Sequence, residues 1–326
     1  MPNKRFKFDI SEPPSTVYIF LVSFVVFSLA SRQFNTVYNW SNILIQSSIL
    51  SVISLGVMVV IISGGMDLSV GNVLTLSGVV CGVFLSRGMP LGLSVLLGVL
   101  TGGACGLING LMITKMRIPP FIATLSMMYI AAGMSNTFSQ RKTVYWEKNI
   151  VLHYIGNEKV LGIPLFILIS LFVAVLVILI LKRSILGVYA YAIGGNEEVP
   201  LLSGINTIKW KLIIYSMSGL LAGVAGILMN SRLGCADPIV GSGYEFYAVV
   251  AAIIGGNTLG SGKGNLLGGI LGVVTLTMIR NGFSLMGLLT HWQMVIVGLI
   301  LVLGMLINKT LANPVGVSYL KLWRRK

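Results

Sequence analysis

The sequence is poor in acidic, histidine and cysteine residues, which limits the chemistry available to it. Its 326 residues include nine Asp and Glu residues and two His. The three cysteines, Cys81, Cys105 and Cys235, lack the spacing of a metal-binding or redox pair. The sequence also has no nucleophile motif, carboxylate pair or dinucleotide fingerprint. We therefore predict a non-catalytic chain that binds no metal or cofactor of its own.

What the sequence has instead is long apolar stretches. Hydrophobic residues make up 55% of the chain, charged residues 10%, and the mean hydropathy is +0.91, whereas soluble domains carry about 25% charged residues. A membrane-spanning helix needs roughly 20 mostly apolar residues. We predict an all-α membrane protein with eight to ten spanning helices, some short or broken, in one domain over residues 1–326. The ten candidate spans are residues 17–31, 43–62, 72–86, 91–113, 120–138, 164–181, 211–229, 245–256, 265–279 and 292–307.

The distribution of Lys and Arg predicts the orientation. With the N-terminus in the cytoplasm and ten alternating spans, fifteen of the 23 Lys and Arg residues fall in cytoplasmic segments, in agreement with the positive-inside rule. Arg280 is among the outer eight, because it follows the span 265–279. Both termini are then cytoplasmic, residues 139–162 form an extracytoplasmic loop and residues 182–210 a cytoplasmic loop. Because the basic residues form no patch, nucleic acid is not an expected partner.

Asp67 is the most informative charged residue. It lies between two candidate spans and follows Gly64-Gly65. An ionisable residue at membrane depth is costly and often functional. The glycines also suggest a break in the helix, where a carboxylate accepts backbone N–H groups at the start of the next helix. Capping is the favoured interpretation of Asp67, and a substrate or proton site is the alternative.

Two further acidic residues, Asp237 and Glu245, flank residues 238–244 on the outer side of the predicted topology. A carboxylate at the start of a span complements the positive end of the helix dipole. This is the favoured role of Glu245. Contact with an extracytoplasmic partner is the alternative for both residues.

The cytoplasmic loop contains a short acidic turn. Asn196 is suited to cap a short helix with Glu197 and Glu198 in its first turn. Pro200 is tolerated only near the start of such a helix. The helix would form a lever for a cytoplasmic motor, and an ordinary connector is the alternative.

Eight short stretches carry a resemblance to a known family. They are residues 64–71, 118–125, 192–198, 202–205, 241–245, 255–256, 281–282 and 293–294. In this order and spacing they resemble the permease subunits of ATP-binding-cassette importers for ribose, allose and xylose, from about residue 42 to residue 308. Val188 stands where a basic residue is usual in that family, and Val199-Pro200 where small residues are usual.

The resemblance implies passive translocation of a monosaccharide such as ribose through a permease dimer, formed with a second copy or a paralogue, in the bacterial cytoplasmic membrane. It also implies an extracytoplasmic sugar-binding protein and a cytoplasmic ATPase that binds ATP and Mg²⁺. Residues 257–264 approach a phosphate-binding loop but lack its first glycine and the hydroxyl after Lys263. ATP is therefore expected on the partner rather than on this chain.

The resemblance also assigns candidate site residues. The cytoplasmic loop would dock on the ATPase through Asn196, Glu197, Glu198, Ser203 and Gly204. Candidates for the sugar path are Asp67, Asn72, Asn109 and Asn281, although hydrogen bonding between helices is the favoured role of the three asparagines.

Three other functions remain as alternatives. A permease for a furanone of the autoinducer-2 type is the alternative within the same family, because specificity there resides largely in the binding protein. A proton-coupled secondary transporter, with Asp67 or Glu245 as the proton carrier, is an alternative outside it. A non-transporting membrane scaffold or receptor is the third.

Overall fold

In the computed structural model the chain is almost entirely helical. The structure describes residues 15–146, 150–160, 162–258 and 260–312. A small antiparallel hairpin, β1 (Lys159–Val160) and β2 (Ile163–Pro164), is the one sheet in these residues, and the sequence did not predict it. The helices are α1 (Ser15–Ala30), η1 (Arg32–Asn35), α2 (Val37–Ile62), α3 (Val70–Ser86), α4 (Leu91–Thr114), α5 (Pro120–Phe138), α6 (Ile150–Asn157), α7 (Leu165–Arg183), α8 (Ile185–Gly195), α9 (Glu198–Leu202), α10 (Thr207–Leu233), α11 (Tyr244–Ile254), α12 (Leu266–Leu285) and α13 (Thr290–Ala312).

Each of the ten apolar stretches in the sequence forms a helix. Several helices extend beyond the stretches, since polar residues at their ends continue the helix. α12 runs on to Leu285 and includes Arg280. The prediction that Arg280 lies in an outer loop is therefore wrong, because arginine is a good helix former and does not by itself end a helix.

The lengths of these helices differ widely. α2, α4, α10 and α12 are each long and apolar enough to cross a bilayer, and α7 with α8, bent by 72° between them, forms a fifth candidate. The helical segments of α1, α3, α11 and α13 tested by the same criterion are apolar but shorter. The chain is a polytopic α-helical membrane protein with some short and bent helices.

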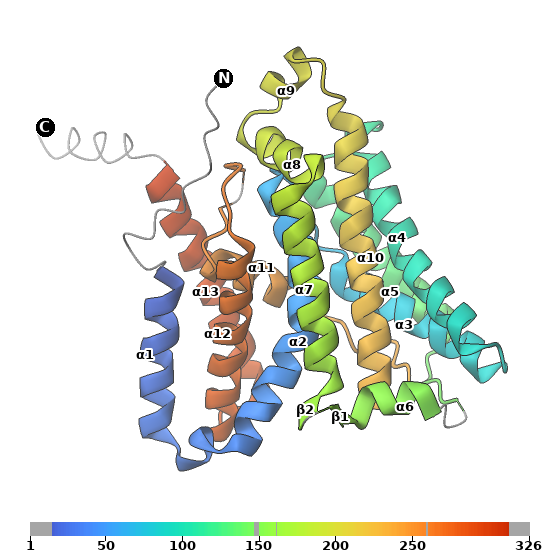
Figure 1. Cartoon of the computed structure of the whole chain (residues 1–326), viewed down its shortest axis with the longest axis vertical. Coiled ribbons are helices and arrows are strands. Elements are labelled where there is room, and N and C mark those ends of the chain that lie inside the picture. Colours follow the sequence, from blue (N-terminus) through green and yellow to red (C-terminus); the bar gives the residue numbers. More distant parts are fainter. Residues whose placement is uncertain (1–14, 147–149, 161, 259, 313–326) are drawn as a thin grey trace, which may run out of the picture.

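The helices run between two ends of the molecule, which Figure 1 shows at top and bottom. α8 and α9 lie at one end, and α13 runs toward it; we call this the α9 end. α6 and the β1–β2 hairpin lie at the opposite, α6 end.

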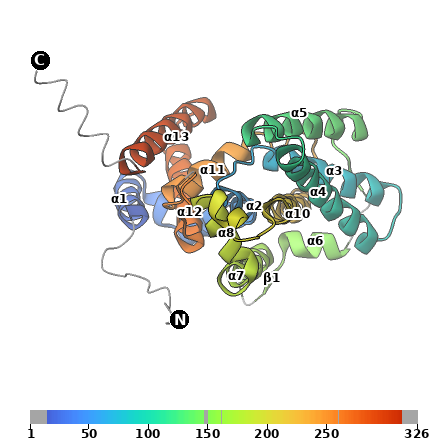
Figure 2. The ribbon, with the colours of Figure 1, turned by 90° about the horizontal axis from the view of Figure 1, so that it is seen from above.

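α2 and α10 form the centre of the molecule. Seen from above, α1, α12 and α13 lie on one side of them and α3, α4 and α5 on the other (Figure 2). Every residue of α2 from Ser47 to Ile62 is buried, and a helix that is apolar on all sides is expected in such a place.

Glycines allow α4 and α10 to pack closely. A β-carbon at Gly102 would lie 2.3 Å from the carbonyl oxygen of Gly219, and one at Gly106 would lie 2.2 Å from that of Tyr215. Membrane helices approach this closely only through small residues. The glycine pattern of the sequence therefore serves packing at this contact.

The two halves of the chain repeat one order of elements in opposite directions. α2 runs toward the α9 end and is followed by a non-helical corner, residues 63–69, and the short α3. α10 runs toward the α6 end and is followed by a corner at residues 234–243 and the short α11. The first turns of α3 and α11 meet, because a β-carbon at Gly71 would lie 3.2 Å from the backbone nitrogen of Glu245. The Thr75 hydroxyl of α3 also accepts the N–H of Gly241, in the corner before α11, at 2.9 Å. Short helices that begin inside a transporter commonly surround its substrate path.

We expect Gly106→Ala to destabilise the protein by about 1–3 kcal/mol, because the added methyl group has no space beside the Tyr215 carbonyl. The midpoint of thermal unfolding in detergent measures this effect. Gly298→Ala in α13 is the matched control, since nothing lies within 4 Å of its β-carbon position, and it should unfold at or slightly above the wild-type temperature. Equal midpoints for the two variants would contradict the packing argument.

Candidate translocation path and coupling segment

Asp67 lies in the corner between α2 and α3 and is 1% exposed. One carboxylate oxygen accepts hydrogen bonds from the N–H (3.0 Å) and hydroxyl (2.7 Å) of Ser69, and the other accepts one from the Ser218 hydroxyl of α10 (2.8 Å). Asp67 therefore fixes the backbone that leads into α3. Its bond is to the N–H of Ser69, the residue just before the helix, and not to a residue of the helix itself. The described residues place no basic side chain in an ion pair with Asp67.

The same corner is tied to α4 and α10 by two further side chains. The Asn109 amide donates to the Ser69 hydroxyl at 2.9 Å, while its carbonyl oxygen is buried without a partner. The Tyr215 hydroxyl donates to the Met66 carbonyl at 3.3 Å, and Gly65 leaves room for it. Non-helical backbone is tolerated at membrane depth only where protein or a water-filled cavity satisfies it. Asp67 satisfies the Ser69 N–H in this way, and Tyr215 satisfies the Met66 carbonyl.

The four candidate path residues do not form one group. Asp67 and Asn109 meet through Ser69, and Asn72 lies in the first turn of α3, nearby along the chain. Asn281 lies apart from them, toward the α6 end, where its amide exchanges two hydrogen bonds with that of Asn39 in α2 (2.8 and 2.9 Å). Asn281 thus joins two helices, as the favoured interpretation of the asparagines predicted.

The two outer acidic residues differ in burial. Asp237 is partly exposed in the corner before α11, where it accepts the Ile239 N–H at 2.9 Å. Glu245 is 3% exposed in the first turn of α11 and accepts the Gly243 N–H at 3.2 Å. Its second oxygen has no hydrogen-bond partner and contacts Gly71 at the start of α3. The carboxylate of Glu245 thus lies between the positive ends of two helix dipoles.

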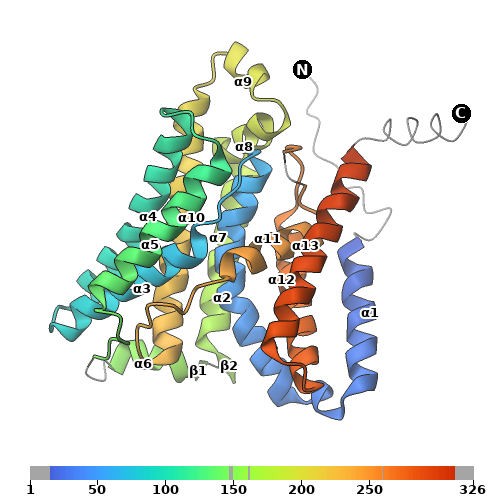
Figure 3. The same cartoon turned by 180° about the vertical axis from the view of Figure 1, so that it is seen from behind.

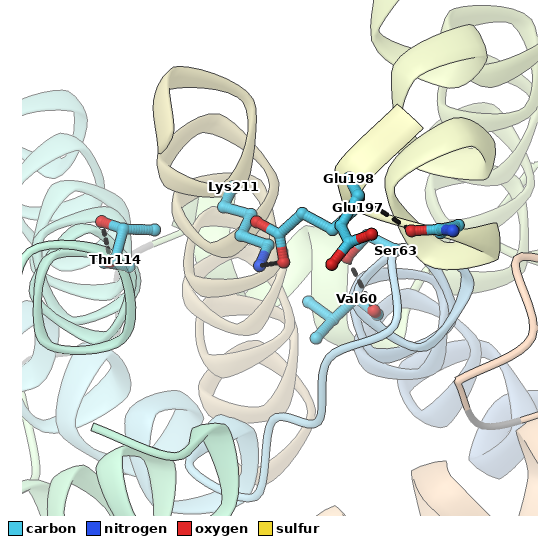
Figure 4. Close-up of polar contacts among 8 residues, drawn as sticks. Val60, Ser63, Thr114, Glu197, Glu198 and Lys211 are labelled. Atoms are coloured by element: carbon cyan, nitrogen blue, oxygen red, sulfur yellow. Dashed lines mark hydrogen bonds and ion pairs between the residues drawn. The ribbon is translucent and has the colours of Figure 1, made fainter. Parts of the chain in front are cut away.

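The acidic turn of residues 196–198 joins α8 to α9 (Figure 4). Asn196 ends α8, and its side-chain oxygen accepts the N–H of Glu198, the first residue of α9, at 2.9 Å. Glu197 forms an ion pair with Lys211 of α10 at 2.5 Å. Because the pair is partly exposed, it fixes the direction of the turn more than it stabilises the fold.

α9 ends in a tight turn and presents apolar side chains outward. The Ser203 hydroxyl donates to the Val199 carbonyl at 2.9 Å, and Gly204 has φ +77°. Val199 and Leu201 are exposed, and Leu202 is 87% exposed. Exposed apolar residues gathered beside charged ones are typical of a protein–protein contact.

α8 packs tightly against the ends of other helices. A β-carbon at Gly194 would lie 1.9 Å from the carbonyl oxygen of Ile62, the last residue of α2, and 3.0 Å from Gly262, in the loop between α11 and α12. The Tyr191 hydroxyl donates to the Gly264 carbonyl in that loop at 3.0 Å. α8, which together with α9 forms the candidate coupling segment, therefore contacts both halves of the molecule.

Sequence reasoning missed several residues of these sites. Ser218 and Tyr215 bind the Asp67 corner, and Lys211 pairs with Glu197, but all three lie in an apolar or basic stretch with no local signal of these roles. Only one feature of the sequence would have suggested this ion pair: Glu197 lies in the predicted cytoplasmic loop, and Lys211 directly follows that loop.

Short helices that begin inside the molecule are a feature of transporters, and the comparison with known sequences agrees. A family described as branched-chain amino acid transport system / permease component matches residues 39–305. The chain belongs to this permease family. No solved structure matches the permease at a significant level.

Curated relatives of the permease carry sugar-transport names. Ribose import permease protein RbsC of Escherichia coli (strain K12) is 35% identical over 291 residues, which cover 88% of this permease and 91% of RbsC. RbsC of Bacillus subtilis (strain 168) is 33% identical over 87% of this permease and 89% of its own length. D-allose transport system permease protein AlsC of Escherichia coli is 33% identical, with 91% and 92% covered.

We expect Ser218→Ala to lower the free energy of unfolding by about 1–3 kcal/mol, because it removes a hydrogen bond from the buried Asp67 carboxylate. Thermal unfolding in detergent measures the loss. Ser170→Ala is the control, since the buried Ser170 hydroxyl bonds only within α7, to the Ile167 carbonyl, and it should lose less. If Asp67→Asn made the Ser218→Ala effect no smaller, the two residues would not be coupled.

Proposed function

We propose that this chain is the membrane subunit of an ATP-binding-cassette importer that forms the path for a monosaccharide such as ribose. Its relatives RbsC and AlsC, whose names specify ribose and D-allose, support the substrate class over nearly the whole chain. ATP and Mg²⁺ are bound by a cytoplasmic ATPase partner, an extracytoplasmic protein delivers the sugar, and a second permease copy or paralogue completes the path. This chain performs no covalent chemistry.

The proposed topology has ten spans in the bacterial inner membrane, with the α9 end and both termini in the cytoplasm. The basic residues between α4 and α5, at the end of α7 and at the start of α10 support it, because they all belong to the α9 end. In this orientation the cytoplasmic loop 182–210 contains α8 and α9. The extracytoplasmic loop 139–162 contains α6 and β1, and the whole chain, residues 1–326, forms one permease domain.

The coupling segment is proposed to dock on the ATPase. The exposed side chains of Val199, Leu201 and Leu202 support this role, because they leave an apolar surface beside an acidic turn. Glu197 and Glu198 would complement a basic groove, with Asn196, Ser203 and Gly204 setting the shape of the turn. Movement of α8 would reach the path through its contacts with α2 and the α11–α12 loop.

The path is proposed to pass the meeting point of α3 and α11. The polar candidates from the sequence near this point are Asn72 of α3 and Asn109 of α4. Asp67 holds these two helices together through Ser69. Docking of the binding protein is proposed around the partly exposed Asp237, with Glu245 holding the first turns of α3 and α11 together beneath it. Asn281 is assigned to helix association.

The function is tested by uptake into proteoliposomes containing the permease, its ATPase and its sugar-binding protein. We expect ribose uptake that needs ATP and persists with a proton uncoupler, because ATP rather than a proton gradient drives it. Uptake abolished by the uncoupler would instead support a proton-coupled transporter. ATP-dependent uptake of a furanone but of no monosaccharide would support the autoinducer-2 alternative.

Variants of the coupling segment belong to the same experiment. Leu202→Asp and the double change Glu197→Ala with Glu198→Ala should each weaken copurification of the ATPase and reduce uptake severalfold, since they alter the proposed docking surface. Leu233→Asp is the control, because Leu233 is also exposed but ends α10 at the opposite end. Intact association and uptake in the double variant would refute the coupling role.

The orientation is tested by labelling Cys235, because Cys81 and Cys105 are buried. A membrane-impermeant maleimide should label right-side-out vesicles and leave inside-out vesicles unlabelled. Burial and the nearby Asp237 raise the pKa of the Cys235 thiol, so labelling should accelerate as the pH rises and thiolate forms. Asp237→Asn should accelerate labelling at neutral pH, whereas the control Asp237→Glu should not. Preferential labelling of inside-out vesicles would reverse the topology.

A further inference from the structure

Arg280 is the single charged residue of α12 and has no ion pair to explain it. No carboxylate of the described residues lies within salt-bridge distance of its guanidinium group. Its Nε atom is buried without a hydrogen-bond partner, although the residue as a whole is partly exposed. An arginine inside an apolar membrane helix is costly and typically faces a functional pathway. We therefore expect the charge of Arg280 to interact with a group outside the described side chains.

Tyr247 of α11 holds this guanidinium group in place. The guanidinium carbon lies 3.9 Å from the centre of the Tyr247 ring, within the range of a cation–π contact. The ring is 8% exposed and packs edge-on against Tyr244, with the ring centres 6.0 Å apart. A guanidinium group held by its face keeps its N–H donors available at its edge. The contact thus orients Arg280 without using its hydrogen-bonding capacity.

The surroundings of Arg280 belong to the proposed path. α11 lies between α5 and α13 (Figure 3), and its first turn meets that of α3 where Glu245 lies against Gly71. Thr277 lies one turn from Arg280 on α12, and its buried hydroxyl also lacks a partner. Residues three apart share a helix face. Two neighbouring polar groups on α12 therefore have unused hydrogen-bonding capacity beside the short helix α11.

We propose that Arg280, oriented by Tyr247, contacts the substrate and donates paired hydrogen bonds to adjacent hydroxyl groups of the monosaccharide. The fork of a guanidinium group suits two neighbouring oxygen acceptors. Passage past α11 would then place the sugar against a fixed donor rather than a mobile one. This inference rests on the proposed function of the chain as a sugar permease. A lipid phosphate or a carboxylate of a second permease copy would instead make Arg280 a structural anchor.

The test compares sugar uptake with ATP hydrolysis in proteoliposomes containing the complete importer, with ribose as the probe. Arg280→Gln should lower the ribose imported per ATP hydrolysed by roughly tenfold, the range expected for lost charged hydrogen bonds. ATPase activity stimulated by the binding protein and assembly with the ATPase should stay at wild-type levels. Arg280→Lys, which keeps the charge and loses the planar fork, should give an intermediate ratio.

Three control variants separate contact with the sugar from a structural role of Arg280. Tyr247→Leu should lower the ratio as Arg280→Gln does, whereas Tyr247→Phe, which keeps the ring under the guanidinium, should match the wild type. Arg87→Gln should also match it, because Arg87 is exposed after α3. An unchanged ratio in Arg280→Gln would overturn the inference. Uptake, ATPase activity and assembly falling together would do so as well, because an anchor to lipid or to a second copy gives that result.

The wild-type measurement distinguishes this inference from the proposed function on which it rests. If the wild-type importer shows no ATP-dependent uptake of any monosaccharide, the proposed function fails and the role of Arg280 in sugar contact fails with it. If the wild type imports ribose and the Arg280 variants do so with equal efficiency, only the inference fails.

Discussion

A chain that leaves the helical conformation inside a membrane must satisfy its free backbone groups within the protein. In the corner at residues 63–69, Asp67 and Tyr215 provide such partners for the Ser69 N–H and the Met66 carbonyl. Asp67 accepts three hydrogen bonds while excluded from solvent, and the Tyr215 hydroxyl caps the Met66 carbonyl. The rest of the architecture depends on this corner, because it allows α3 to begin inside the molecule rather than at its surface.

The second corner meets the same requirement in another way. Residues 234–243 bond to α3 through Thr75, and Glu245 occupies the space left by Gly71 between the two short helices. Each short helix thus begins against the other. A lack of apolar residues does not account for the shortness of α3 and α11, since both helices are apolar along their length.

Local sequence patterns predicted much of the fold. Apolar runs identified ten of the helices within the described residues, and Gly64-Gly65 correctly indicated a break. They missed α8, which is as long as α11 but lies in the predicted cytoplasmic loop. The pattern did not predict the partners of the polar residues, because Ser218 lies 151 positions from Asp67 and Asn281 lies 242 from Asn39. Such pairs depend on which helix faces meet in three dimensions. The prediction for Arg280 was wrong for a related reason. Its charge was interpreted as the end of a helix, whereas within the helix the charge is stabilised by the ring of Tyr247 in α11.

α2 is held differently at its two ends. Near its start, paired amides join Asn39 to Asn281, with directional bonds that resist separation. The carbonyl group of its last residue, Ile62, packs closely against Gly194 of α8, a contact that resists compression but not sliding. A force on α8 would therefore tilt α2 as a rigid body, with the Asn39–Asn281 contact as the fixed point. The largest displacement would occur beside Asp67 and the start of α3, and the smallest at the far side of the membrane.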